Sequence, residues 1–575
     1  MARIRRLNIS NFRSIQALDW APSPGINCLI GPGDSGKSSI LDAIDLCLGA
    51  RRSSSFGDMD FFAMNVEVPI TISVTLGDLP ASLMDIDVYG DFLRGFNPLT
   101  GVIEDEPGVG LETVITIRLQ VGADLEPSWS LFSDRAAQQQ LERSLPWKER
   151  TALAPARIGG FTSSNLSWSR GSVLNRLTDE RVELGAELAR AARQARENFG
   201  NQATAPLTNT LGVVQRTAQQ LGISVGAMPK ALLDAHSVSI GEGAIALHNE
   251  AGIPLRSLGT GSSRLLVAGL QRAAATIAPI ALVDEVEHGL EPHRLMRFLD
   301  SLGAKDAGAP LQVFMTTHSP VALRELSGDQ LFVIRPWNGH HYVLVAGSSN
   351  EVQSTLRADP EAFLAKSIIV CEGASEVGFA RGLDQLWISC GATSFLAHGG
   401  AYVNAGGGSP DNSLNRGTAL RKLGYRVLVF VDADKPAAEG VSEAFLAVGG
   451  EILTWRPYLT LEDEIFRCLS DQALDALLAK AEETVGTDLM NQHIQSKSQG
   501  RVTLDSIQID RLVFGYPPAT RELLGAASRI RNSGWFKSLT TYQDIARNIV
   551  GPDLMNSEAG FKAVTDQLWA FTSAS

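Results

Sequence analysis

A glycine-rich turn between an apolar run and a helical pattern constrains the fold of this chain more than any other feature. Residues 31–38 read GPGDSGKS, fit the pattern G-x-x-x-x-G-K-[ST], and follow the apolar run 26–30. A strand, such a turn and a helix over 37–48 form the setting in which backbone N–H groups surround phosphates at a helix N-terminus. We therefore expect an α/β domain that binds a nucleotide. The alternative is a glycine-rich turn with an exposed lysine.

The residue types in this turn predict individual roles. Lys37 would balance the charge of the β- and γ-phosphates, and Ser38 would ligate Mg²⁺. The other candidate nucleotide contacts in the turn are Gly31, Gly33, Asp34, Ser35, Gly36 and Ser39.

Two acids at the end of a later apolar run predict the catalytic part of the same site. The run 280–283 ends in Asp284 and Glu285. Asp284 would hold Mg²⁺, and Glu285 would orient or deprotonate the attacking water. Because strands ending in two acids are common, the neighbouring motifs decide the interpretation.

The order of those motifs resembles that of ABC ATPases. The segment LGTGSSR at 258–264 resembles the ABC signature loop, with Gly259 where the usual serine stands. His318, in TTHSP, resembles the switch histidine that senses the γ-phosphate. The resemblance implies ATP as cofactor and a homodimer, since the signature loop of one subunit completes the nucleotide site of another. The signature contacts that it implies are Gly259, Thr260, Gly261 and Ser262.

The first strand also resembles a known group. The segment LNISNFRS at 7–14 is similar to the opening strands of SMC/RecF-like DNA-repair ATPases. In that group an arginine near this position can approach the nucleotide, which makes Arg13 a candidate nucleotide contact.

Changes of character along the 575 residues predict several domains, because the chain is too long for one core. Residues 1–130 and 236–350 would form the two parts of the ATPase, and 351–575 a second α/β domain. The 3.6-residue periodicity within 131–235 predicts a helical insertion, either an exposed amphipathic hairpin or a dimerisation arm. The polar segment 346–360 is interpreted as a linker, and 393–398 as a strand.

Pairs of acids follow three predicted strands of the second domain. Glu372 ends one strand and Glu376 lies four residues later, Asp432 and Asp434 end another, and Glu462 and Glu464 open a helix after a third. Any one pair is more often a solvated helix cap. Together they would meet at the carboxyl edge of a parallel sheet, where divalent cations relieve the repulsion between like charges. Two Mg²⁺ or Mn²⁺ ions held there would serve phosphodiester hydrolysis.

This acidic pattern resembles the Toprim domain of topoisomerases, primases and OLD-family nucleases. The turn NAGGGS at 404–409 agrees with that resemblance, and TLE at 460–462 and GWFK at 534–537 resemble OLD nucleases specifically. In those enzymes a lysine near the C-terminus supports the scissile phosphate, which implies this role for Lys537. An ordinary surface lysine is the alternative.

The order of ATPase and Toprim resembles OLD-family endonucleases, in particular the class encoded beside a UvrD-like helicase, which includes the nuclease subunit of Gabija defence systems. The resemblance implies DNA as substrate, a homodimer through the ATPase and its arm, and a possible helicase partner. The expected function is an ATP-dependent, metal-dependent DNA endonuclease in DNA repair or antiviral defence. One rival is an SMC/RecF-like DNA-binding ATPase with a non-catalytic Toprim fold. The other, a topoisomerase or primase, lacks a visible nucleophile domain or zinc module.

Composition sets looser limits. The net charge of −13 argues against a whole surface coated by nucleic acid, although residues 491–575 carry a slight basic excess. Five widely spaced cysteines predict reduced thiols rather than a zinc site or disulfides. The chain shows no apolar run that could span a membrane and no signal peptide, so a cytoplasmic protein is expected.

Overall fold

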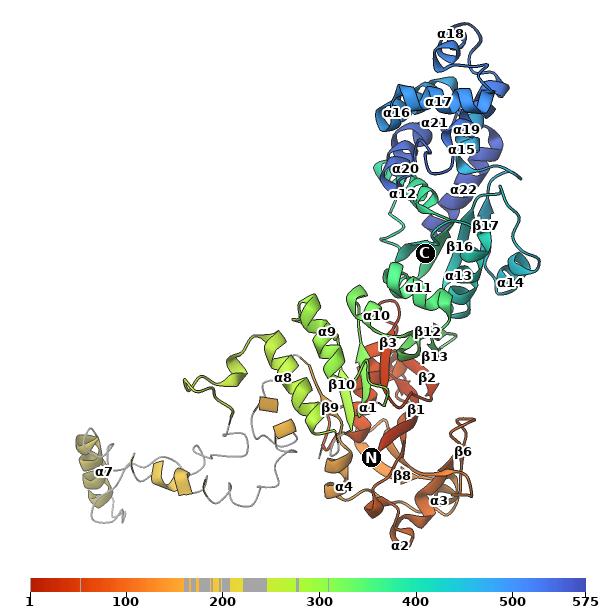
Figure 1. The fold of residues 1–575 in the computed structure, drawn as a ribbon. Helices are drawn as coiled ribbons and strands as arrows, with labels where there is room; N and C mark the ends of the chain where they lie inside the picture. The colour runs from red at the N-terminus through yellow and green to blue at the C-terminus, as the bar shows by residue number, and fades with distance from the viewer. Residues whose placement is uncertain are drawn as a thin grey trace. The chain divides into compact units, whose positions relative to one another are not determined.

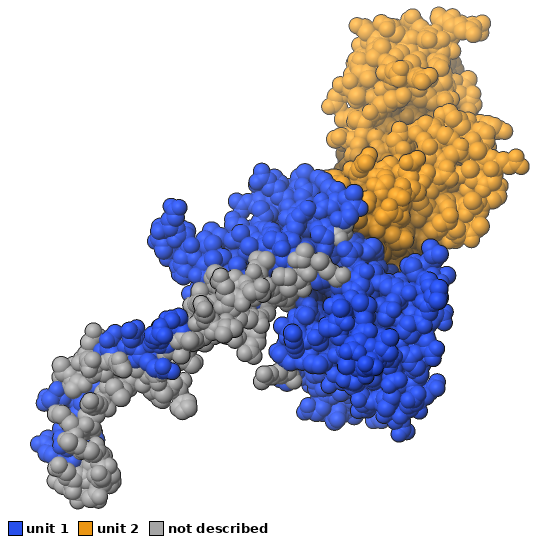
Figure 2. Space-filling model, turned by 60° about the horizontal axis from the view of Figure 1, so that its bottom comes forward, with its two compact units in different colours: residues 1–27, 38–316 blue, residues 28–37, 317–575 orange. Residues whose placement is uncertain are grey.

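The chain divides into two compact units, which are described separately below. A computed structural model describes residues 2–51, 53–159, 246–275, 279–308 and 310–574, and between 160 and 245 it describes 165–166, 172–174, 187, 190–195, 198 and 207–220. Unit 1 consists of residues 1–27 and 38–316, and unit 2 of residues 28–37 and 317–575. Figure 1 labels the elements, and Figure 2 colours the two units.

Unit 1 contains both antiparallel and parallel strands, as expected for an ATPase with a large mixed sheet. The antiparallel strands follow the order β6-β5-β7-β4-β1-β2, with β8 pairing β7, and the parallel strands follow the order β11-β10-β9. The strands are β1 (Arg3–Phe12), β2 (Ile15–Trp20), β4 (Ile70–Gly77), β5 (Leu93–Phe96), β6 (Ile103–Glu104), β7 (Glu112–Val121), β8 (Pro127–Phe132), β9 (Ala156–Arg157), β10 (Ile280–Val283) and β11 (Gln312–Thr316). The helices are α1 (Lys37–Leu48), α2 (Ile86–Tyr89), α3 (Asp134–Gln138), α4 (Trp147–Leu153), α7 (Thr208–Gln220), α8 (Thr260–Ala273) and α9 (Pro292–Ser301).

Helix α1 lies against the antiparallel strands. Ile40, Leu41 and Ile44 on this helix are buried. The thiol of Cys47 contacts the carbonyl oxygens of Ile72 and Ile117 at 3.5 and 3.4 Å. Burial raises the pKa of this thiol to about 12, so Cys47 remains a neutral core residue. The helix that follows the glycine-rich turn is thereby fixed to the sheet.

About half of the predicted insertion at 131–235 lies outside the described residues, mainly within 160–206 and 221–235. In its described part, β9 pairs in parallel with β10 through Ala156 and Arg157, so the sheet extends into the range expected to be helical. Helix α7 agrees with the predicted helical character at Thr208–Gln220. Most of the strand signals expected at 237–248 also fall outside the described residues.

Unit 2 contains a short run of ATPase strands and a separate parallel sheet. The first run has the order β13-β12-β3. It is formed by β3 (Ile26–Ile30), which enters unit 2 at Cys28, by β12 (Leu331–Trp337) and by β13 (His340–Val345), with α10 (Pro320–Glu325) and α11 (Asn350–Ala358) nearby in sequence. The second sheet has the order β15-β14-β16-β17 and is parallel throughout. Its strands and intervening helices are β14 (Ser367–Cys371), α12 (Ala374–Ser389), β15 (Gly400–Asn404), α13 (Pro410–Lys422), β16 (Arg426–Val431), α14 (Val441–Ala447) and β17 (Glu451–Thr454).

Two local predictions for unit 2 were wrong. The proposed linker 346–360 contains helix α11, capped by the Ser349 hydroxyl, which accepts a hydrogen bond from the N–H of Val352 at 3.4 Å. Val352 and Leu356 on this helix are buried, so an apolar stripe at helical spacing outweighs the polar composition of the segment. The strand expected at 393–398 is a turn, and the strand begins at Gly400.

Helices after β17 extend the core of unit 2. They are α15 (Leu461–Cys468), α16 (Asp471–Val485), α17 (Thr487–Ser498), α18 (Leu504–Phe514), α19 (Pro518–Ser528), α20 (Leu539–Ile545), α21 (Gly551–Asp553) and α22 (Ala559–Ser573). Buried aromatic rings join them to the sheet, because Trp455 stacks on Phe561 at 5.3 Å and meets Phe430 edge-on at 5.5 Å. None of the helices that the structure describes is long and apolar enough to cross a membrane.

Candidate functional site

The glycine-rich turn forms a loop around the ammonium group of Lys37. The Nζ atom of Lys37 donates hydrogen bonds to the carbonyl oxygens of Gly31 and Pro32 at 3.1 and 2.8 Å and lies 3.2 Å from the Ser35 hydroxyl. Gly36 has a φ of +82°, a conformation that favours glycine. A buried cation enclosed by a glycine-rich backbone loop is suited to binding phosphate oxygens.

Ser38 and Asp284, predicted as Mg²⁺ ligands, lie together in unit 1. The Ser38 hydroxyl donates to Asp284 Oδ1 at 3.2 Å. The hydroxyl of Thr316 also donates to Asp284 Oδ1, at 2.5 Å, and accepts a hydrogen bond from the backbone N–H of Glu285 at 2.8 Å. The end of β11 thus fixes both acids at the end of β10. Sequence reasoning did not identify Thr316.

Arg264 is a second residue that sequence reasoning missed. It is fully buried in α8, and its guanidinium donates to the carbonyl oxygens of Glu285 and His288. Burial lowers the pKa of Arg264, while the nearby acids Glu287, Glu285 and Asp284 oppose that shift. The arginine in the predicted signature segment therefore holds the backbone at and after Glu285, the predicted catalytic acid.

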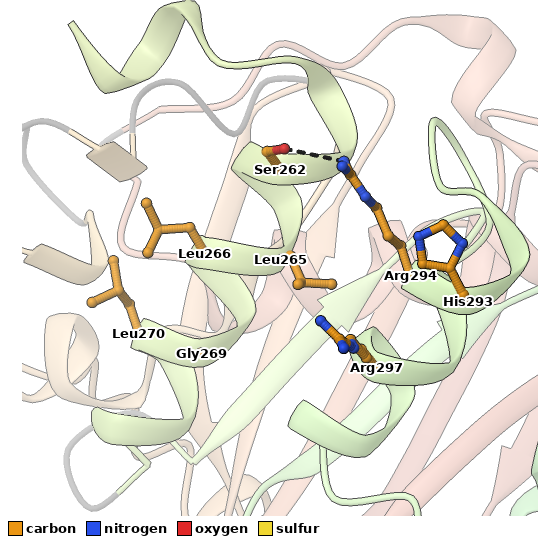
Figure 3. A pocket seen from close by; sticks show the side chains of 8 residues that line it. All are labelled: Ser262, Leu265, Leu266, Gly269, Leu270, His293, Arg294 and Arg297. Atoms are coloured by element: carbon orange, nitrogen blue, oxygen red, sulfur yellow. Dashed lines mark hydrogen bonds between the residues drawn. The ribbon is translucent and has the colours of Figure 1, made fainter. Parts of the chain in front are cut away.

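The predicted signature residues form the start of α8 and pack on the segment after β10. A Cβ on Gly261 would lie 2.6 Å from the carbonyl oxygen of Gly289, so only glycine permits this approach. The hydroxyl of Ser262 accepts a hydrogen bond from Arg294 of α9 at 3.1 Å (Figure 3). Gly259 and Thr260 are exposed at the N-terminus of the helix. Both residues are therefore open to solvent in a single copy of the chain.

The other predicted nucleotide contacts are placed as follows. His318 is exposed and follows β11. Arg13 pairs with Asp42 on α1 at 2.5 Å and with Asp60 at 3.1 Å, so it is held by carboxylates of its own unit. Gly33, Asp34 and Ser38 are exposed, whereas Gly31, Ser35 and Gly36 are buried and Ser39 is half-buried.

Four predicted metal ligands gather at the carboxyl edge of the parallel sheet in unit 2. The carboxylate of Glu372, after β14, accepts a hydrogen bond from the N–H of Asp432, after β16, at 3.2 Å. Asp432 in turn accepts one from the N–H of Leu461 at 2.9 Å, which ties it to the start of α15. Glu376 accepts from the N–H of Gly373 at 2.7 Å. The fourth member, Glu462, lies one residue into α15.

The charges of these four residues act on one another. Burial, then the charge of Glu462, raises the pKa of Glu376 to about 7. Burial, then the charges of Glu376, Glu462 and Glu372, raises the pKa of Asp432 well above its ordinary value. The pKa of Glu372 is raised by burial and by Asp434 and Glu462. The carboxylates are therefore close enough to disfavour simultaneous ionisation.

The donor set matches a divalent cation in chemistry, because buried carboxylates that repel one another are stabilised by positive charge. Their arrangement is not that of a formed site. Among the described residues, no group of three or more His, Cys, Asp or Glu side chains is arranged so that it could hold a metal ion. The carboxylates would have to rotate from their present hydrogen bonds to share a cation.

Glu464, predicted as a ligand with Glu462, belongs to a different cluster. Arg456 donates to both of its carboxylate oxygens, at 2.9 and 2.8 Å, and the thiol of Cys468 donates at 3.1 Å. Although burial raises the pKa of Glu464, the hydrogen bonds from Arg456 and Cys468 hold it below its ordinary value. This pairing occupies the carboxylate.

Two further residues complete the description of the acidic edge. The hydroxyl of Tyr542, fully buried on α20, donates to Glu462 Oε1 at 2.7 Å. Sequence reasoning missed Tyr542, because nothing near it in sequence marks it as polar and buried. Lys537 is exposed, and its side chain lies over Gly534. Within the described part of the chain, no ion pair joins Lys537 to a carboxylate.

The loop around Lys37, the paired acids after β10 and their strand–helix setting define a P-loop ATPase that binds ATP. The model of the family described as "AAA domain, putative AbiEii toxin, Type IV TA system" matches residues 26–324, and the chain belongs to that family. This fold implies ATP hydrolysis.

Curated relatives are similar over short stretches. The chain is 58% identical over 50 residues to the DNA replication and repair protein RecF of Vibrio vulnificus, covering 9% of this chain and 14% of the relative. It is 30% identical over 115 residues to RecF of Porphyromonas gingivalis, covering 20% of this chain and 24% of the relative. The chain therefore spans about a seventh to a quarter of the length of these relatives.

Solved structures of SMC heads are also similar. The SmcHead bound to the C-winged helix domain of ScpA is 17% identical, with a TM-score of 0.34, 59% of this chain covered and 96% of that chain. The SMC head domain from Thermotoga maritima is 15% identical, with a TM-score of 0.27, 60% of this chain covered and 98% of that chain.

Proposed function

We propose that this ATPase is an ATP-regulated, divalent-metal-dependent DNA endonuclease similar to the OLD family, with its nuclease site in a Toprim domain. One observation carries the proposal: Glu372, Glu376, Asp432 and Glu462 meet at the carboxyl edge of one parallel sheet, where burial and neighbouring carboxylate charges raise the pKa values of Glu372, Glu376 and Asp432. Crowded, buried acids destabilise a fold unless positive charge neutralises them. This favours cation binding as their function.

Each residue at this edge has a distinct part in the proposal. Glu372, Glu376, Asp432 and Glu462 would hold Mg²⁺ or Mn²⁺, with Asp434 at the rim, 3.7 Å from Lys435. When bound, two such cations supply Lewis-acid stabilisation of the attacking and leaving oxygens of a phosphodiester. Tyr542 orients Glu462 through its hydrogen bond. Lys537 would contact the scissile phosphate, and Glu464 is left out of the ligand set.

The ATPase part of the proposal follows the sequence motifs. Lys37 and the turn Gly31–Ser38 would bind the phosphates of ATP, Ser38 and Asp284 would hold Mg²⁺, and Glu285 and His318 would act on the attacking water and the γ-phosphate. A second copy of the chain would supply the signature residues Gly259–Ser262. DNA as ligand is supported by the short similarity to proteins named for DNA replication and repair. A UvrD-like helicase partner follows only from the resemblance to the OLD class.

One observation favours a second candidate, a DNA-binding ATPase whose Toprim fold does not cut. The described carboxylates do not stand in a metal-binding arrangement. In this alternative, the buried acids would be stabilised by protonation and by their hydrogen bonds to the backbone and to Tyr542.

Cleavage of supercoiled plasmid DNA separates the two candidates. The full chain is incubated with Mg²⁺ or Mn²⁺, with and without ATP, and nicked and linear products are quantified. We expect nicking by the wild type, loss of nicking in Asp432→Asn, and wild-type nicking in Glu443→Gln, which removes an exposed acid of the same unit. Lys37→Ala is expected to abolish ATP hydrolysis and the effect of ATP on nicking. Plasmid binding without cleavage by the wild type would establish the alternative.

A further inference from the structure

The antiparallel strands of unit 1 carry a polar pocket that belongs to neither site described above. The pocket has a volume of about 300 Å³ and is lined by side chains of β1, β2, β4, β5, β7 and β8. On β4, the lining residues Thr71, Ser73 and Thr75 alternate with the buried residues Ile72 and Val74. The pocket therefore lies on the face of these strands opposite to the apolar core.

The strand register gathers the polar residues into rows. Ser73 on β4 is directly opposite Arg118 on β7, and Thr75 is opposite Thr116. Thr116 is in turn opposite Phe132 on β8. Because residues directly opposite in an antiparallel pair point to the same face, these five side chains project into the same space.

Buried hydroxyl groups form the floor of the pocket. Ser73, Thr75 and Thr116 are only 6%, 1% and 2% exposed. The hydroxyls of Thr75 and Thr116 share a hydrogen bond of 2.9 Å, which uses one of their two hydrogens. Burying hydroxyls on a sheet face that water normally reaches is costly unless they find partners.

Arg118 supplies the positive charge of this pocket, whereas Arg94 is already paired with carboxylates. Arg118 donates to the Ser73 hydroxyl at 3.2 Å and stacks on Phe132, with its guanidinium carbon 3.2 Å from the ring centroid. No described carboxylate lies within 4.0 Å of Arg118, and burial lowers its pKa. Arg94 pairs with Asp134 at 3.1 Å, and its buried Nε, which makes no hydrogen bond with described residues, lies 3.5 Å from the carboxylate of Asp105.

We propose that this pocket binds the phosphate group of a nucleotide, either a free mononucleotide or one within a DNA strand. The guanidinium of Arg118 provides donors in the geometry that phosphate oxygens prefer, and the floor provides hydroxyl donors beside it. Phe132 offers an aromatic wall against which a sugar or base can pack. The site depends on neither the nuclease assignment nor the ATP site, because all its lining residues come from the antiparallel strands.

Arginine footprinting of the full chain tests this site at single-residue resolution. The protein is treated with phenylglyoxal, and the labelling rate of each arginine is measured by peptide mass spectrometry without ligand, with 2′-deoxyadenosine 5′-monophosphate, and with a short single-stranded oligodeoxynucleotide. We expect slower labelling of Arg118 with at least one probe and unchanged labelling of exposed Arg256. Protection by the mononucleotide alone identifies a free nucleotide as ligand, and protection by the oligonucleotide alone identifies DNA. Equal labelling of Arg118 under all conditions overturns the proposal.

A matched pair of variants keeps the test independent of folding. Thr116→Val removes a floor hydroxyl at nearly constant volume, and we expect about tenfold weaker protection of Arg118. Thr113→Val makes the same change on β7 outside the pocket. In this variant the probe should protect Arg118 from labelling as strongly as it does in the wild type. Equal protection in both variants contradicts the role of the hydroxyl floor. Should Thr116→Val fail to fold by circular dichroism, the wild-type footprint alone decides.

Discussion

Tyr542 links the acidic edge of unit 2 to its helical part through one buried hydrogen bond. Its hydroxyl reaches Glu462, whereas Glu464, two residues along the same helix, pairs with Arg456. Residues two apart on a helix point to different sides, so one member of this pair had to leave the cluster. The residue that a carboxylate contacts, rather than its spacing in sequence, decides its role.

Replacing Tyr542 with phenylalanine tests the role of this hydrogen bond. The buried carboxylate of Glu462 would lose a donor, which should lower the free energy of unfolding by about 1.5–3 kcal/mol. A lost supporting hydrogen bond should also slow plasmid nicking about 10- to 100-fold at saturating Mn²⁺. Urea unfolding and nicking rates measure the two effects. Tyr458→Phe, at a side chain that is 81% exposed, is the control and should leave both unchanged.

Arg264 is a buried hydrogen-bond donor of the same kind in unit 1, since it supports the backbone of Glu285. Removing its guanidinium leaves the backbone carbonyl oxygens of Glu285 and His288 without a charged donor, so Arg264→Ala should cost about 3 kcal/mol or more of unfolding free energy. ATP hydrolysis should fall with it, because Glu285 loses its backbone support. Chemical unfolding and phosphate release are the measurements. The exposed Arg256→Ala should behave as wild type, and wild-type hydrolysis by Arg264→Ala would contradict the role given to this arginine.

Helices α12 and α20 approach so closely that their contact depends on glycine. A Cβ on Gly378 would clash with the carbonyl oxygen of Leu539, and one on Gly382 would clash with that of Gln543. These glycines lie on α12, whose first turn contains Glu376, and Tyr542 lies on α20. The distance between the two helices therefore sets where Tyr542 meets the acids.

Gly378→Ala should push these helices apart. We expect overpacking to cost about 1–3 kcal/mol of unfolding free energy. Plasmid nicking should also slow, because Tyr542 is displaced from Glu462. Gly269→Ala on α8 is the matched control, since a Cβ there meets nothing within 4 Å. Unfolding and nicking assays compare the two variants, and equal stability of Gly378→Ala and wild type would falsify the close-contact interpretation.

At the scale of the whole molecule, the chain joins an ATPase of the AAA family to a parallel sheet with an acidic edge. The two parts differ in the conditions under which they would bind a metal ion. The ATPase needs a nucleotide to hold Mg²⁺ firmly, because phosphate oxygens complete its coordination. The acidic edge is proposed to attract cations without a nucleotide, because its carboxylates repel one another.

Divalent cations should therefore stabilise the nucleotide-free chain. At a cation concentration of about 100 Kd, binding to the native state alone contributes about 2.7 kcal/mol. We expect Mn²⁺ to raise the Tm of the wild type and of Lys37→Ala. The Tm of Asp432→Asn should not change when Mn²⁺ is added. Differential scanning calorimetry with a chelator as reference measures the shift. An equal shift in Asp432→Asn would place cation binding elsewhere.

The sequence determined those parts of the protein in which neighbouring residues act together. The strand, turn and helix over 26–48 and the acids after 280–283 follow from glycine geometry, apolar runs and fixed spacing, which hold in any context. The strands that end at Cys371 and Val431 were also predicted, because fully buried parallel strands read as continuous apolar runs.

Only the tertiary structure decided which side chains meet. It paired Arg13 with Asp42, joined Arg264 to the backbone of Glu285, folded 350–358 into a helix, and separated Glu462 from Glu464. These outcomes depend on packing between residues that are remote in sequence, where burial and partner geometry outweigh local preference. Spacing in the sequence fixes the backbone path over a few residues, whereas the energy of a buried charge depends on everything that surrounds it.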